Sequence, residues 1–131
     1  MKILIDTSVL SHTLRRANPS GLYVQKLQEL FDSGQPLFIC GLVLTEILSG
    51  VRHIEQLNKL VKHMEAFPML ELDRKGFVKA AQLRSHCRRN GVQCTTVDAI
   101  IAQTAMSHGC RLFTADSDFL DVARYSDLQL L

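Results

Sequence analysis

The sequence predicts an α/β protein in which helices cover both faces of a central parallel sheet. Short apolar runs such as Ile3-Leu4-Ile5 lack the polar alternation of a half-exposed strand, so both of their faces are expected to be covered. Segments with apolar residues at helical spacing separate these runs along the chain. Strands that alternate with helices favour a parallel sheet with right-handed crossovers, and therefore an α/β/α sandwich.

Length and composition are those of one globular domain. The chain has 131 residues, of which 47% are hydrophobic and 21% are charged, which is enough for a hydrophobic core without disulfides. We find no linker or internal repeat, so residues 1–131 are expected to form a single domain. No apolar run approaches the roughly 20 residues that span a bilayer, and the first residues do not resemble a signal peptide. The four cysteines lack Cys-x-x-Cys spacing and are expected to be free thiols, which favours a cytoplasmic protein.

The first half of the chain is predicted to form two strands and four helices. The boundaries come from apolar residues at spacings of three and four, and from Gly and Pro at the breaks. In order, we expect a strand at 3–5, a helix at 7–14, a loop at 15–21, a helix that ends before Gly34, a strand at 36–40, a helix at 42–50 and a helix that ends before Pro68.

The second half is predicted to add three strands and three helices. Asp73 is a favoured N-cap residue for a long helix, and Asn90-Gly91 is a usual helix end. Thr95 or Thr96 is expected to cap the next helix, which is almost entirely apolar. In order, we expect a strand at 69–72, the long helix, the apolar helix at 97–108, a strand at 111–114, a short helix at 116–124 and an edge strand at 128–131.

Four acidic residues stand next to or inside apolar segments. Asp6 and Asp116 follow predicted strands, Asp98 opens the apolar helix and Glu46 interrupts another apolar helix. Each has an ordinary structural explanation, because Asp commonly caps helices and a helical Glu commonly faces solvent. The predicted topology nevertheless brings all four toward the carboxyl-terminal edge of one sheet, where α/β proteins bind ligands.

A cluster of carboxylates repels itself unless a cation is bound. Mg²⁺ prefers oxygen ligands and is commonly held by a few carboxylates together with substrate phosphates, and Mn²⁺ tolerates similar sites. A water bound to such an ion can act as a nucleophile on phosphorus. Without these four charges the net charge of +2 would become +6, so an acidic site on a basic body is expected to receive a polyanion.

The four acids lie in four segments: Ile3-Leu4-Ile5-Asp6-Thr7-Ser8-Val9-Leu10, the helix that contains Glu46, Val97-Asp98-Ala99-Ile100-Ile101-Ala102, and Leu112-Phe113-Thr114-Ala115-Asp116-Ser117-Asp118-Phe119. Together these segments resemble the PIN domain family, and the size of the chain and the order of the motifs resemble its VapC-type toxins. The resemblance covers essentially the whole chain. At Thr95-Thr96-Val97, just before Asp98, the sequence differs from the residues that are most common in the family, but none of the carboxylates is changed.

The resemblance implies a Mg²⁺-dependent endoribonuclease. Asp6, Glu46, Asp98 and Asp116 would bind the metal directly or through water, and Asp118 would be an auxiliary acid. Ser8 and Thr114 match hydroxyl positions that orient acids and metal-bound water in the family. A helix cap for Ser8 and a strand end for Thr114 are equally compatible with the sequence. The family also implies a cognate antitoxin and a homodimer.

Cations around the predicted acidic edge are candidates for RNA contacts. Arg15 and Arg16 follow the first helix, and Arg52 comes soon after Glu46, so these three residues are our candidates for binding phosphates. Arg88 and Arg89 are equally explained as favourable charges at a helix C-terminus. The five histidines show no metal-ligand spacing, and we assign them no catalytic role.

Three other functions are consistent with part of the pattern. A phosphohydrolase with Asp6 as a covalent nucleophile is disfavoured, because Ser8 stands where haloacid dehalogenase enzymes have a second acid. A noncatalytic RNA-binding PIN module would be expected to lack the acids. A housekeeping PIN nuclease would have the same site residues as a toxin, so the sequence does not distinguish these two functions.

Overall fold

Four short parallel strands form the centre of the molecule, in the order β3-β2-β1-β4. β1 (Ile3–Ile5) pairs with β2 (Leu37–Cys40) on one side and with β4 (Arg111–Phe113) on the other. β3 (Met69–Leu70) pairs with β2 and forms one edge. The predicted parallel sheet is therefore confirmed, with β1 as an inner strand.

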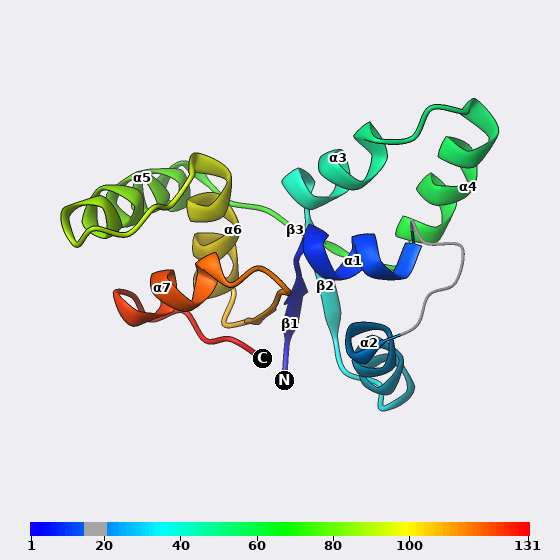
Figure 1. The fold of residues 1–131 in the computed structure, drawn as a ribbon, viewed down its shortest axis with the longest axis horizontal. Coiled ribbons are helices and arrows are strands. Elements are labelled where there is room, and N and C mark those ends of the chain that lie inside the picture. The colour runs from blue at the N-terminus through cyan, green and yellow to red at the C-terminus, as the bar shows by residue number, and fades with distance from the viewer. Residues whose placement is uncertain (15–20) are drawn as a thin grey trace.

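Helices lie on both sides of this sheet in the computed structural model, which describes residues 1–14 and 21–131. Figure 1 shows α1, α2 and α4 on one side and α5, α6 and α7 on the other, which confirms the α/β/α sandwich. The helices of the described residues are α1 (Thr7–Leu14), α2 (Leu22–Asp32), α3 (Gly41–Ser49), α4 (Ile54–Met64), α5 (Arg74–Arg89), α6 (Thr96–Ser107) and α7 (Asp118–Arg124). None of the helices in this part of the chain is long and apolar enough to cross a bilayer.

The core is centred on β1. Ile3, Leu4 and Ile5 are fully buried, as expected for a strand without polar alternation that is covered on both faces. Ile101 of α6 and Phe119 of α7 are also almost completely buried. The four cysteines are buried and free, as predicted.

Capping residues define where α5 and α6 begin. The Asp73 side chain accepts a hydrogen bond of 2.8 Å from the Gly76 amide, which confirms Asp73 as the N-cap of α5. Thr95, not Thr96, is the N-cap of α6. The two helices pack against each other, and the Arg84 Nε of α5 donates to the Cys94 carbonyl just before α6 over 3.0 Å. The start of α6 is therefore fixed both by its cap and by α5.

Several predicted boundaries were wrong by a few residues. The expected edge strand at 128–131 is reduced to one parallel bridge between Leu112 and Leu130. α7 begins at Asp118 instead of Asp116, because Asp116 forms a turn in which its Oδ1 accepts from the Asp118 amide over 2.9 Å. The helix expected at 42–50 begins at Gly41, directly after β2.

Candidate active site

The site is formed where the chain leaves two neighbouring strands in opposite directions. α1 follows β1, and α7 follows β4 after a short turn. These two helices lie on opposite sides of the sheet (Figure 1). Such a change of direction leaves a crevice at the carboxyl ends of the strands, which is the usual ligand site of an open α/β sheet.

Asp6 is held at this crevice by two hydroxyl groups. The Asp6 side chain is 5% exposed, and a buried carboxylate needs hydrogen-bond partners. Its Oδ2 accepts from Ser8 Oγ over 2.8 Å and from Thr114 Oγ1 over 2.7 Å. The orientation of this carboxylate is therefore fixed by residues from both sides of the crevice.

The same two hydroxyl groups also bind the turn after β4. Ser8 Oγ accepts from the Ala115 amide over 2.8 Å, and Thr114 Oγ1 accepts from the Asp116 amide over 3.0 Å. Since each hydroxyl has one proton, accepting from an amide leaves that proton for Asp6 Oδ2. Ser8 lies inside α1 and does not cap it. The hydroxyl groups thus join the Asp6 carboxylate to the backbone that carries Asp116.

Four carboxylates line one cavity of about 260 Å³ at this crevice. They are the acids selected from the sequence, namely Asp6, Glu46, Asp98 and Asp116. None of the described residues that line the cavity is Lys, Arg or His. The cavity is therefore strongly acidic.

Asp98 is positioned by the first turn of α6. Its amide donates to Thr95 Oγ1 over 3.0 Å, and its Oδ2 accepts from the Thr95 amide over 3.4 Å, so the two residues form a capping box. Burial raises the pKa of the Asp98 carboxyl, and the charges of Asp116 and Asp118 raise it further, whereas the bonds from Thr95 lower it. Negative charge is thus concentrated around Asp98.

Glu46 reaches the cavity from α3. The residue is exposed, as is common for a helical Glu, and it lines the cavity together with the three Asp residues. Thr7 Oγ1 of α1 donates to Glu46 Oε1 over 3.3 Å. This bond connects the residue after Asp6 to the acid on α3.

The donor set suits a hard divalent cation. All four side chains offer carboxylate oxygens, which Mg²⁺ and Mn²⁺ prefer. Within residues 1–14 and 21–131, no three His, Cys, Asp or Glu side chains are grouped closely enough to hold one ion together. The residue types therefore fit a metal that keeps several waters and takes further ligands from a substrate phosphate.

Comparison with known proteins gives the family. A model of the PIN domain matches residues 3–125. The chain belongs to the PIN domain family. It is 32% identical over 129 residues to ribonuclease VapC11 of Mycobacterium tuberculosis, which covers 97% of this chain and 96% of that protein. This places the PIN domain described here among the VapC-type members, as the sequence motifs predicted.

Solved structures share the PIN fold along almost the whole chain. VapBC2 from Rickettsia felis, bound to a promoter DNA fragment, superposes with a TM-score of 0.81 at 21% identity, covering 100% of this chain and 98% of that one. VapC20 of Mycobacterium tuberculosis, described as a toxin that cleaves the sarcin-ricin loop, gives 0.68 at 16% identity, with coverages of 98% and 99%. At these identities the likeness supports the fold.

Other predicted residues of this PIN domain lie outside the cavity. Asp118 is exposed and does not line it, although its charge acts on Asp98. Arg52 is exposed after α3 and does not line it either. Arg15 and Arg16 lie outside the residues that the structure describes.

Sequence inspection missed one positioning contact in the PIN domain and left another undecided. The bond from Thr7 to Glu46 joins residues that are 39 positions apart, and no local pattern connects them. The capping box of Thr95 and Asp98 has the local spacing of an N-cap and its third helical residue, so it was open to prediction. Two threonines therefore support two of the four cavity acids.

Proposed function

We propose that this PIN domain is a metal-dependent endoribonuclease that acts as the toxin of a toxin–antitoxin pair. The observation that carries the proposal is the acidic cavity lined by Asp6, Glu46, Asp98 and Asp116. The name of the relative VapC11, a ribonuclease, supports the reaction class. The cytoplasm, where RNA is plentiful, is the expected place of action.

Mg²⁺ or Mn²⁺ would be bound in the cavity by its carboxylates, some directly and others through water. Such an ion supplies a nucleophilic water and offsets the charge that develops on phosphorus. Ser8 and Thr114 keep the Asp6 carboxylate in one orientation through their hydrogen bonds. Thr95 and Thr7 do the same for Asp98 and Glu46. Precise placement of such groups accounts for much of the catalytic power of phosphoryl-transfer sites.

A cognate antitoxin and a second copy of the chain are the expected protein partners. The solved relative VapBC2 is a complex bound to promoter DNA, and a toxin–antitoxin complex from Klebsiella pneumoniae also shares the fold. Exposed apolar residues offer contact area on the helices of one layer, such as Leu22 and Phe31 of α2 and Ile54 of α4. The oligomeric state is measured by light scattering on the purified chain.

RNA cleavage tests the proposed activity. Purified wild type is incubated with total cellular RNA in Mg²⁺, in Mn²⁺ and in chelator, beside Asp98→Asn and the surface control Asp121→Asn. We expect discrete fragments from wild type and Asp121→Asn with metal, and no fragments from Asp98→Asn or with chelator. Equal cleavage by wild type and Asp98→Asn would contradict the proposal. In that case a noncatalytic RNA-binding module becomes the better function.

The toxin role needs a separate test, because a housekeeping nuclease would cleave RNA in the same way. Induced expression in a bacterial host is expected to stop growth with wild type and not with Asp98→Asn. A small reading frame beside the gene, co-expressed with the toxin, should restore growth. Growth that is unaffected by the active nuclease would favour the housekeeping role.

A further inference from the structure

α5 carries six of the 15 Lys and Arg residues of the chain. Its 16 residues include six Lys or Arg and no Asp or Glu: Arg74, Lys75, Lys79, Arg84, Arg88 and Arg89. The helix therefore has a formal charge of +6, whereas the whole chain has +2. The rest of the chain is thus net −4, so positive and negative charge are separated between this helix and the remainder.

These cations are available to a partner. Five of them are exposed, and Arg84 is half-buried where its Nε donates to the Cys94 carbonyl. The single ion pair in the described part of the chain joins Arg124 to Asp121, on α7. Within residues 1–14 and 21–131, the cations of α5 therefore form no ion pair with a carboxylate.

Helix stability does not explain this charge pattern. Arg74 and Lys75 lie in the first turn, where the helix dipole disfavours positive charge. Lys75 and Lys79, and likewise Arg84 and Arg88, are like charges at a spacing of four, which destabilises a helix. The usual compensation by Glu at that spacing is absent from α5. Arg88 and Arg89 alone are favoured by the dipole at the C-terminal end.

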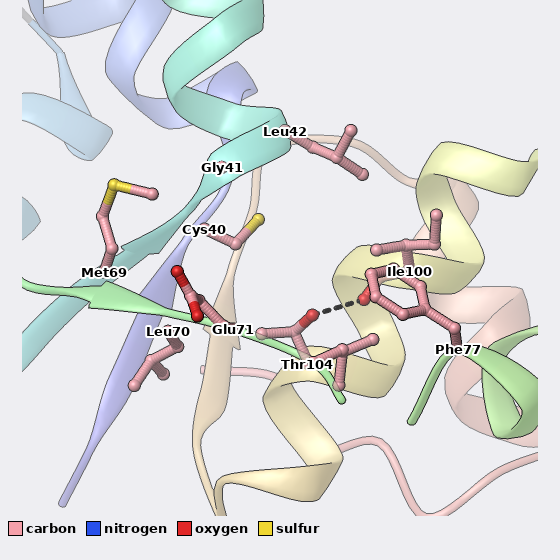
Figure 2. A pocket seen from close by; sticks show the side chains of 10 residues that line it. Cys40, Gly41, Leu42, Met69, Leu70, Glu71, Phe77, Ile100 and Thr104 are labelled. Carbon is pink, nitrogen blue, oxygen red and sulfur yellow. Dashed lines mark hydrogen bonds between the residues drawn. The ribbon is translucent and has the colours of Figure 1, made fainter. Parts of the chain in front are cut away.

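Hydrophobic packing does not require the cations either. The buried face of α5 consists of Gly76, Ala80, Leu83 and Cys87. Figure 2 shows Phe77 of α5 beside Ile100 of α6 in an apolar cavity of about 360 Å³ between α5, α6 and β3. The charged residues occupy the remaining, outward part of the helix.

The position of α5 links it to the acidic cavity. α5 packs against α6 more extensively than any other pair of elements in the described chain. The first turn of α6 carries Asp98, and its Thr96 lines a groove of about 340 Å³ together with Arg84 and Ser85 of α5. Packed helices lie about 8–10 Å apart. A polyanion with one phosphate at Asp98 would therefore meet α5 within a few nucleotides.

We propose that the exposed face of α5 binds the backbone of the RNA substrate beside the acidic cavity. The inference rests on the proposed ribonuclease function and adds a docking surface to it. The five exposed cations of this helix can contact several phosphates of a single strand. The cavity itself repels phosphate, so these cations supply attraction that the acids cannot.

Binding of an RNA of defined length tests this surface. A fluorescein-labelled 20-nucleotide oligouridine is titrated with Asp98→Asn, which prevents cleavage, and anisotropy is recorded at several salt concentrations. The test variant adds Lys75→Gln, Arg88→Gln and Arg89→Gln. A matched control adds Lys26→Gln, Lys59→Gln and Lys62→Gln, three exposed lysines of α2 and α4. Both variants lose the same net charge.

We expect the α5 variant to bind about 10- to 100-fold more weakly, and the control to bind within about threefold of the parent. The salt dependence, as the slope of log K against log salt, should become shallower by about 2 in the α5 variant, since each lost single-strand contact changes it by about 0.7. Equal losses in both variants, or no loss in either, would overturn the inference. If the α5 variant fails to fold, Lys75→Gln with Lys79→Gln replaces it, because that pair relieves repulsion.

Two further measurements separate the explanations. Polyglutamate is added as an unlabelled competitor, with its carboxylates at the same concentration as the RNA phosphates. If it displaces the RNA under these conditions, α5 is a binding surface for an acidic protein partner instead. Cleavage by the wild type with Mg²⁺ is measured separately. If the wild type cleaves RNA and the α5 variant binds RNA normally, the docking surface fails and the ribonuclease stands. If RNA binds through α5 but the wild type does not cleave it, the ribonuclease fails and the surface stands.

Discussion

The Thr114 hydroxyl joins the ends of two strands through one carboxylate. It donates to Asp6 Oδ2 and accepts from the Asp116 amide. In Thr114→Val the shape is kept but both bonds are lost, which we expect to reduce the free energy of unfolding by about 1–3 kcal/mol. RNA cleavage should fall at least tenfold, because two cavity acids lose their support. Urea denaturation and a cleavage assay measure the two effects.

Thr114→Ser is the matched control for this prediction. It retains the hydroxyl and should keep both stability and cleavage near the wild-type values. A valine variant that matches wild type in both assays would show that the hydroxyl network does not position Asp6 and Asp116.

Asp98 combines a capping role with a charge that the fold disfavours. Burial and the neighbouring acids raise the pKa of its carboxyl, so at neutral pH the ionised form costs stability. Asp98→Asn removes that charge, so without metal we expect its Tm to be higher than that of wild type by a few °C. Added Mg²⁺ should then raise the Tm of wild type more than that of Asp98→Asn, since a ligand stabilises the state that binds it.

Asp121→Asn tests whether this gain is specific to Asp98. Asp121 is exposed and pairs with Arg124, so its replacement should leave Tm unchanged or slightly lower. Equal gains from the two substitutions in metal-free thermal unfolding would show that the loss of any one carboxylate charge, and not the acidic cavity, is the cause.

The acids of the site were predictable because the order of strands and helices brings them to one edge of the sheet. Asp6 and Asp116 follow strands that pair side by side, and the Asp98 helix and the Glu46 helix begin at the same edge. The hydrogen bonds that support these acids were harder to predict from the sequence. Thr114 and Asp6 are 108 residues apart, and Thr7 and Glu46 are 39 apart, so their hydrogen bonds depend on side-chain geometry that no local pattern specifies.

At the scale of elements, α6 depends on its capping box. In Thr95→Ala the Asp98 amide loses its acceptor, which typically costs about 1 kcal/mol. The same change leaves Asp98 in the first turn of α6 without its capping partner. We therefore expect the affinity for Mg²⁺ and the cleavage rate to decrease by more than the loss of stability alone would cause. Thermal unfolding and calorimetric metal titration measure these quantities.

Thr95→Ser keeps the capping oxygen and is expected to behave as wild type. Thr45→Ala removes a hydroxyl that bonds to the Gly41 carbonyl within α3, and it provides a threonine change on another helix. If Thr95→Ala weakens metal binding no more than Thr45→Ala does, the box stabilises α6 without positioning Asp98.

Element type was easier to predict than element ends. The fully buried β1 and the long α5 follow directly from apolar patterning and from the Asp73 cap. The edge strand expected at 128–131 forms one bridge only, because pairing at an edge depends on the neighbouring strand and not on local sequence. The start of α7 moved by two residues because the Asp116 side chain bonds to the backbone of its own turn.

At the scale of the whole molecule, the buried thiols set the behaviour at alkaline pH. Burial raises the pKa of all four cysteines, and that of Cys94 to about 12. In the unfolded chain a thiol titrates at about 8.5. Above that pH the unfolded chain loses protons that the folded chain retains, so the free energy of unfolding decreases as pH rises.

Cys94 should contribute about 1 kcal/mol of this decrease between pH 7.5 and pH 9.5, because its thiol ionises over that range in the unfolded chain and stays protonated in the folded one. Urea denaturation under reductant at both pH values measures the decrease for wild type and for Cys94→Ala. The variant should be less stable at pH 7.5, since it loses buried volume, and the gap should narrow by about that amount at pH 9.5. A gap that stays constant would mean that the Cys94 thiol ionises in the folded protein as readily as in the unfolded chain.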